Sequence, residues 1–153
     1  MKEALHQDAS KTYPQGYTIY KPTRRGSGGA VRLNLNAAKQ AIFVEAANQS
    51  GERQFDWDSK IIMKWGLSDI GSILALLQGR TAEAKLFHKT ASASSACEIL
   101  PHDDPEHAPY TLKISRQEES DKNVRRVAIP LTHPEAALLE TALRTATVRI
   151  MGW

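Results

Sequence analysis

Side chains that could bind a polyanion are concentrated in the first half of this 153-residue chain. Residues 1–65 carry ten Lys or Arg against six Asp or Glu, whereas residues 66–153 carry ten against eleven. This asymmetry favours a polyanionic partner, although surplus cations on a solvated surface are a common alternative. The candidate nucleic-acid-binding residues are Lys21, Arg24, Arg25, Arg32, Asn34, Trp57, Lys60, Lys64 and Lys113.

The first group of candidates surrounds a glycine-rich segment. Lys21, Arg24 and Arg25 precede residues 26–29, where three glycines allow the backbone to approach a phosphate closely. Arg32 and Asn34 lie on the polar face of the strand expected next. A flexible, solvated loop is the alternative interpretation of residues 22–29.

The second group of candidates is a set of lysines and one aromatic residue at strand spacing. Lys60 and Lys64 share one strand face, and Lys113 projects similarly from a later strand, although all three could be ordinary solvent-facing charges. Trp57 is the aromatic residue that we select for stacking on a base, with burial in the core as its alternative. We expect Trp65 and Phe87 in the core, and at most one of Arg125 and Arg126 facing a ligand.

Enzymatic chemistry has weaker support in this sequence. The segment 102–107 contains two His and three acidic residues, but it is a proline-flanked loop without a second ligand group at a recognised spacing. Asp56 and Asp58, expected on one strand face, are better explained by a solvated edge or an ion pair with Lys60. Cys97 lacks a nucleophile signature, and the glycine-rich segment lacks the Gly-Lys-Ser/Thr of a phosphate loop. We therefore predict no catalytic, cofactor or metal site.

Composition is that of a soluble globular protein, with 41% hydrophobic and 24% charged residues. The longest aliphatic run, residues 73–77, is too short to cross a bilayer, so no membrane partner is expected. Residues 1–16 lack the apolar segment of a secretory signal, and the single cysteine fits a reducing compartment. The expected location is the cytoplasm.

Hydrophobic alternation dominates the middle of the chain and predicts a series of strands. Residues 48–52 have turn chemistry and residues 91–96 are small and polar, so both segments are expected to be loops. Residues 117–123 are the expected tip of a hairpin. The expected strands are residues 30–36, 40–46, 55–65 with a bend near 58–59, 96–101, 110–116 and 125–131.

Two helices are expected. In the first, Ser68 is the expected N-cap, Ile70, Ile73, Leu74 and Leu77 form the buried stripe, and Gly79 ends the helix.

The last helix has the more complete signal. Thr132 and Glu135 form a capping box, with Pro134 in the first turn. Its apolar stripe includes Leu139 and Leu143 and could face either the core of one subunit or a partner subunit. The terminal Trp153 is expected to fill the fold or a subunit contact. Strands mixed with two helices indicate an α+β domain with mainly antiparallel sheet.

Five segments, in the same order and at similar gaps, resemble the Whirly family of single-stranded DNA-binding proteins. They are Phe55-Asp56-Trp57-Asp58, Leu67-Ser68-Asp69-Ile70-Gly71-Ser72-Ile73, Phe87-His88, Val127-Ala128-Ile129-Pro130-Leu131 and Ile150-Met151-Gly152-Trp153. An opening Tyr17-Thr18-Ile19-Tyr20-Lys21 is similar as well, so the resemblance covers residues 17–153. Residues 1–16 are then a flexible tail before one Whirly-like domain.

The resemblance implies a specific architecture and activity. Family members fold as two antiparallel four-stranded sheets packed across each other with a helix-loop-helix. They assemble as homotetramers, and single strands lie along sheet edges between protomers, largely without sequence preference. Plant members carry a compact Lys-Gly-Lys-Ala-Ala-Leu run, whereas this chain has Lys21-Pro22-Thr23-Arg24-Arg25 followed by the glycines, so assembly beyond a tetramer is not expected. The absence of a plastid-type transit peptide favours a bacterial or phage member.

Together these observations predict a non-enzymatic protein that binds single-stranded DNA, with RNA as a further ligand, during replication, repair or transcription. The main alternative is a structural or regulatory module whose sheet edges recruit a protein by strand addition. A hydrolase using the 102–107 cluster is a third, weaker alternative.

Overall fold

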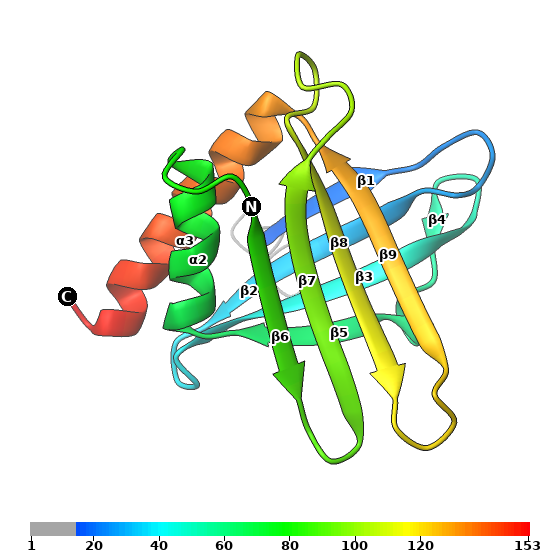
Figure 1. Ribbon diagram of the computed structural model, residues 1–153, viewed down its shortest axis with the longest axis horizontal. Coiled ribbons are helices and arrows are strands. Elements are labelled where there is room, and N and C mark those ends of the chain that lie inside the picture. The colour runs from blue at the N-terminus through cyan, green and yellow to red at the C-terminus, as the bar shows by residue number, and fades with distance from the viewer. Residues whose placement is uncertain (1–14) are drawn as a thin grey trace, which may run out of the picture.

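The computed structural model describes residues 15–153 and contains two antiparallel sheets and two α-helices (Figure 1). Residues 1–14 of the predicted flexible tail, which was expected over residues 1–16, therefore lie outside the described residues. The strands are β1 (Tyr17–Lys21), β2 (Gly29–Asn36), β3 (Ala41–Gly51), β4 (Gln54–Phe55), β5 (Ile61–Trp65), β6 (Ala84–Lys89), β7 (Ala93–Pro101), β8 (Tyr110–Glu118) and β9 (Val124–Leu131). The helices are the 3₁₀-helix η1 (Trp57–Ser59), α2 (Leu67–Leu77) and α3 (His133–Met151).

The first sheet has the order β1-β2-β3, and the long β3 then pairs with β5 and, further along, with β4. The second sheet has the order β6-β7-β8-β9. Buried and more exposed residues alternate most clearly in β5, where Ile61, Met63 and Trp65 are buried and Ile62 and Lys64 are exposed, and in β7. The α+β class with two antiparallel sheets is confirmed, and the two-residue β4 is an addition to the four expected strands of the first sheet.

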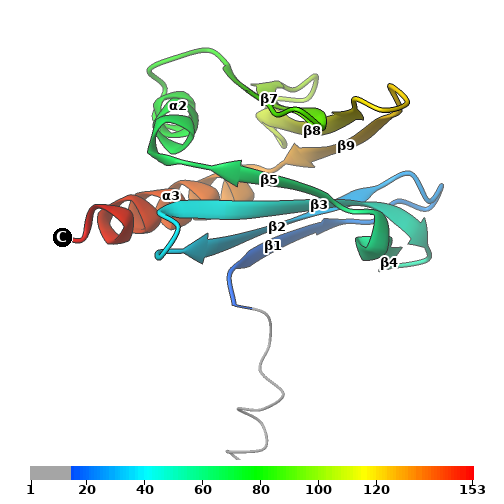
Figure 2. The ribbon, with the colours of Figure 1, turned by 90° about the horizontal axis from the view of Figure 1, so that it is seen from below.

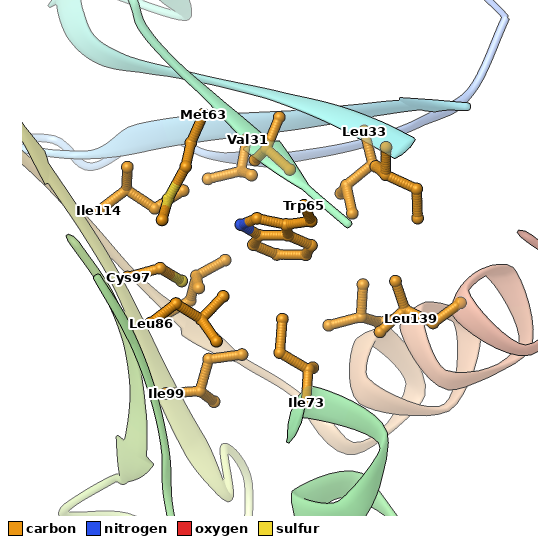
Figure 3. Packing of buried hydrophobic residues seen from close by; sticks show 14 of the residues in the cluster. Val31, Leu33, Met63, Trp65, Ile73, Leu86, Cys97, Ile99, Ile114 and Leu139 are labelled. Carbon is orange, nitrogen blue, oxygen red and sulfur yellow. The ribbon is translucent and has the colours of Figure 1, made fainter. Parts of the chain in front are cut away.

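The core lies between the sheets, which form two layers, and the helices close one end of it (Figure 2). Trp65 is at its centre with no exposed surface, and it lies between residues of both sheets and both helices, including Ile99, Ile73 and Leu139 (Figure 3). Val31 and Leu33 contribute from the first sheet. This burial confirms Trp65 as a core residue. No helix of the described chain has both the length and the apolar character needed to span a bilayer.

Helix α3 forms where its capping box predicts. The Thr132 hydroxyl accepts a hydrogen bond from the Glu135 N–H, and the Glu135 carboxylate accepts one from the Thr132 N–H. Leu139 and Leu143 are buried against the rest of the subunit, which decides between the two alternatives for this stripe. Trp153 does not fill the fold, because it is 91% exposed.

Helix α2 begins earlier than expected. Its N-cap is Gly66 rather than Ser68, because the Asp69 carboxylate accepts a hydrogen bond from the Gly66 N–H at 3.0 Å and closes the first turn. Ile70 and Ile73 are buried as expected.

Two expected loops are strands. Residues 48–51 continue β3, and the turn falls at residues 52–53, where Arg53 adopts a positive φ of 55°. Residues 93–96 belong to β7, in register with the last residues of β8. In both cases the strand is built from small and polar residues, including the buried Ser95, and such a composition does not distinguish a strand from a loop.

Candidate functional site

Three of the nine predicted binding residues, Arg32, Asn34 and Lys64, share the solvent-facing surface of the first sheet, here called the first outer face. The register places Thr18 opposite Arg32, Arg32 opposite Glu45, and Glu45 opposite Ile62. A neighbouring row contains Asn34, Phe43 and Lys64. Cross-strand partners lie on the same side of a sheet, so these side chains form one surface. The first outer face comprises Thr18, Tyr20, Arg32, Asn34, Phe43, Glu45, Ile62 and Lys64.

An ion-pair network lies at the centre of the first outer face. The Glu45 carboxylate accepts from Arg32 Nη1 at 3.2 Å and pairs with Lys60 Nζ at 3.3 Å. The Arg32 guanidinium also lies 4.1 Å from the centre of the Trp57 ring. One carboxylate between two cations leaves a local excess of positive charge, and Arg32 and Trp57 are held in place before any ligand binds.

The helix η1 positions Trp57. Asp56 does not lie on a strand face with Asp58, as expected, but caps η1, accepting a hydrogen bond from the Ser59 N–H at 3.3 Å. Arg125 reaches from β9 and donates to the carbonyl oxygens of Ser59 at 2.7 Å and Lys60 at 3.2 Å. Arg125 is therefore a positioning residue that ties η1 to the second sheet.

Replacing Arg125 by alanine should loosen η1. We expect backbone amides of residues 56–60 to exchange roughly 10- to 150-fold faster, because a hydrogen bond from a charged donor contributes about 1.5–3 kcal/mol. Hydrogen-exchange mass spectrometry measures this directly. Arg126→Ala is the matched control, since Arg126 is exposed and makes no side-chain contact to η1. Equal exchange in both variants would show that Arg125 does not hold η1.

Aromatic residues that the sequence interpretation did not select extend this surface. Tyr20 is 53% exposed, and its ring centre lies 5.7 Å from that of Phe55. The Lys39 ammonium lies 5.6 Å from the centre of the Phe43 ring. In the sequence, the alternation of Tyr20 with the apolar Ile19 could have indicated that Tyr20 faces solvent. A lone tyrosine at the end of a short strand is also common in cores, so this pattern alone does not select it.

A hollow lined by three arginines lies at the end of the first sheet where β1 ends and Gln49 pairs with Phe55. The β1–β2 loop and the β3–β4 turn enclose about 630 Å³, and Arg24, Arg25 and Arg53 line the space together with Glu52. Within the described residues, none of the three guanidinium groups has an acidic partner at ion-pair distance. Arginine pairs with phosphate in a bidentate manner, so the hollow suits a phosphate group.

The loop that carries Arg24 and Arg25 is built around Gln49. The Gln49 amide accepts hydrogen bonds from the N–H groups of Thr23 and Gly28, each at 2.9 Å, and donates to the Thr23 carbonyl at 3.1 Å. A Cβ at Gly28 would collide with the Lys21 carbonyl oxygen, so the loop requires a glycine there. These hydrogen bonds give the loop a defined conformation and disfavour the alternative interpretation, a flexible solvated loop.

Two predicted residues lie elsewhere. Lys21 pairs with Glu135 at the start of α3, with Nζ and Oε1 2.6 Å apart. Lys113 is exposed on β8, on the outer side of the second sheet. Phe87, expected in the core, is 66% exposed on β6, an edge strand.

The enzymatic candidates are separate side chains with local partners. His102 bonds to Thr111 at 2.6 Å and His107 to Asp104 at 3.1 Å. Across residues 15–153 there is no group of three or more His, Cys, Asp or Glu placed to hold a metal ion. Burial raises the pKa of the Cys97 thiol, and the nearby charges of Asp69 and Glu98 raise it further, which disfavours the nucleophilic thiolate.

The first outer face and the arginine hollow together combine cations with accessible aromatic rings. Such a surface can neutralise phosphates and stack on unpaired bases, and neither interaction depends on base identity.

Comparison with known proteins supports the same class. The family model described as Whirly transcription factor matches residues 27–142. The mitochondrial single-stranded DNA-binding protein WHY2 of Arabidopsis thaliana is 26% identical over 132 residues, covering 82% of this chain and 52% of that protein. The chain thus spans about half the length of the curated relatives that it matches.

Solved structures share the fold. The crystal structure of WHY1 from Arabidopsis thaliana has a TM-score of 0.75 at 20% identity and covers 93% of this chain and 88% of that one. A guide-RNA-binding protein complex bound to a guide RNA has a TM-score of 0.64 at 13% identity and covers 94% of this chain and 97% of that one. The curated relatives are plant proteins described as mitochondrial or chloroplastic, so they do not support the expected bacterial or phage origin.

Proposed function

Because this chain belongs to the Whirly transcription factor family, we propose that it binds single-stranded DNA without sequence preference, through the first outer face and the arginine hollow. Single-stranded RNA is a second proposed ligand, since stacking and phosphate contacts serve both polymers. The proposed biological role is the protection or organisation of exposed strands in replication, repair or transcription.

The observation that carries the proposal is the joint placement of Tyr20, Trp57 and Arg32 with unpaired cations. Tyr20 offers a half-exposed ring, and the guanidinium of Arg32 lies over Trp57. The arginine hollow adjoins this surface through Gln49. Gln49 pairs with Phe55 in the sheet, and its side chain also holds the β1–β2 loop, so the hollow formed by Arg24, Arg25 and Arg53 lies next to the aromatic residues. A single strand of nucleic acid whose bases lie on the aromatic rings can therefore place its phosphates against the arginines.

The proposed mechanism is binding alone, without a catalytic step. The relatives named above are described as single-stranded DNA-binding proteins, which supports this proposal. The cytoplasmic location and the bacterial or phage origin expected from the sequence stay predictions.

We further propose a homotetramer held together by α3. Leu138, Val148 and Met151 are 56%, 48% and 47% exposed on the side of α3 away from the core. Val148 and Met151 lie one helical turn apart near the end of α3, and Leu138 lies nearer its start, so exposed apolar side chains at both ends of the helix are available for a second subunit to cover.

A salt titration distinguishes this function from the main alternative, recruitment of a protein by strand addition. Four cations of the site lack acidic partners in the described chain: Arg24, Arg25, Arg53 and Lys64. With four phosphate contacts, the affinity for oligothymidine should fall about 50-fold between 50 and 200 mM salt, from a slope of about −0.7 per contact. Fluorescence anisotropy measures the slope.

The triple variant Arg24→Ala, Arg25→Ala, Arg53→Ala should flatten that slope by about two units. The charge-matched control replaces Arg80, Lys122 and Arg144 by alanine, because these three cations lie outside the first outer face and the arginine hollow. An affinity that does not respond to salt would exclude phosphate contacts and favour strand addition.

A further inference from the structure

The second sheet also presents a surface to solvent, here called the second outer face. It lies on the opposite side of the molecule from the first outer face, because the two sheets pack through their inner surfaces (Figure 2). In Figure 1 the strands β6 to β9 lie in front of the first sheet. The second outer face comprises Lys85, Phe87, Lys89, Ser94, Ala96, Glu98, Lys113, Ser115, Gln117, Arg126 and Ala128.

Phe87 is the largest apolar side chain of this face and is 66% exposed. Its row across the sheet continues with Ala96, Ser115 and Arg126. Alanine and serine are too small to cover an aromatic ring, so the ring of Phe87 stays accessible beside a shallow strip. The strip extends about 14 Å from β6 to β9, from three strand spacings of about 4.8 Å.

Cations outnumber acidic residues around the strip, where Glu98, opposite Lys113, is the one carboxylate of the second outer face. Lys113 lies on the adjacent row, and Lys89 lies two residues beyond Phe87 on the same side of β6. Lys89, Lys113 and Arg126 have no acidic partner at ion-pair distance within residues 15–153. Lys85 differs, because it pairs with Glu83 at 3.3 Å and Glu98 at 3.9 Å.

From this arrangement we infer that the second outer face is a second contact surface for single-stranded nucleic acid. Phe87 stacks on a base, and Lys89, Lys113 and Arg126 contact phosphates. Charge complementarity selects the occupant: a single ring among unpaired cations fits a flexible polyanion, whereas a protein partner would need a larger apolar patch. The inference rests on the proposed function and adds a second site to it.

A second contact surface changes the path that a long nucleic-acid strand can take over the protein. The two outer faces point in opposite directions, so one segment of a strand cannot contact both on the same subunit. A long strand must pass around the subunit or to a neighbour, and two separate strands can be held at once. This subunit can therefore bridge or wrap strands rather than hold them along a single track.

The test compares Phe87→Ala with Phe87→Tyr, which keeps the aromatic ring. Phe87 is exposed, so neither variant should alter thermal unfolding. Anisotropy with a long oligothymidine should show affinity reduced about 5- to 150-fold for Phe87→Ala and within about 3-fold of the parent for Phe87→Tyr. Photocrosslinking with an oligonucleotide that carries 5-iodouracil should give adducts on Phe87.

Unchanged affinity for Phe87→Ala, or adducts confined to the first outer face, would overturn the inference. In that case the proposed function stands if Tyr20 and Trp57 variants still lose binding. If the parent protein binds no single strand at all, both the function and the inference fail.

Discussion

An oligothymidine should lose most of its affinity when Tyr20 and Trp57 are both replaced by alanine. Stacking on an aromatic side chain contributes about 1–3 kcal/mol per base, so the loss of two rings corresponds to roughly 30-fold or more. The guanidinium of Arg32 lies over the Trp57 ring, so removal of that ring leaves Glu45 as the ion-pair partner that positions Arg32. Fluorescence anisotropy at fixed salt measures the change.

The matched control is the double variant Tyr20→Phe, Trp57→Phe. It keeps a ring at each position and should stay within a few-fold of the parent affinity. Circular dichroism and thermal unfolding check that the alanine variant is folded, because Tyr20 and Trp57 are partly exposed and lie outside the core. Equal affinity of the alanine and phenylalanine variants would move the site away from the first outer face.

Replacing Leu143 by aspartate should unfold the protein, whereas the same change at Leu138 should leave it folded. Leu143 has no exposed surface, and a carboxylate there would be buried without a partner at a cost of several kcal/mol. That cost approaches the whole stability of a domain, about 5–15 kcal/mol. Leu138 is 56% exposed, so an aspartate at this position remains in contact with water in one subunit.

The Leu138→Asp variant also tests the proposed tetramer. If α3 joins the subunits through its exposed apolar side chains, a charge at Leu138 weakens that contact, and light scattering should report a smaller species with an unchanged circular dichroism spectrum. Glu140→Gln, on the same helix, is a control that should preserve the assembly. A folded Leu143→Asp variant would contradict the core described here, and an intact assembly of Leu138→Asp would place the subunit contact elsewhere.

The sequence was most informative where local signals agree with one another. Thr132, Pro134 and Glu135 together predict the start of α3, and strand alternation predicts the burial of Ile61, Met63 and Trp65. The first helix illustrates the limit, because Gly66 and Ser68 are both acceptable caps. Only the hydrogen bond from the Gly66 N–H to Asp69 decides between them.

The binding surface was predictable only in part, because it depends on pairing between distant segments. Arg32 and Lys60 were selected from strand patterns, but their shared partner Glu45 follows from the register of three strands. Arg53 joins Arg24 only because the β3–β4 turn folds beside the β1–β2 loop. Phe87 was misassigned to the core because an apolar residue in a short strand gives no sign of which side faces the other sheet.

The central claim is that this surface recognises unpaired bases rather than charge alone. A competition titration tests this claim most directly. Labelled oligothymidine is displaced either by an unlabelled single strand or by a duplex of the same length, at the same salt concentration. The account predicts that the single strand competes at least about 10-fold better, because a duplex offers phosphates but no free base for Tyr20 and Trp57. Equal competition by the duplex would contradict it.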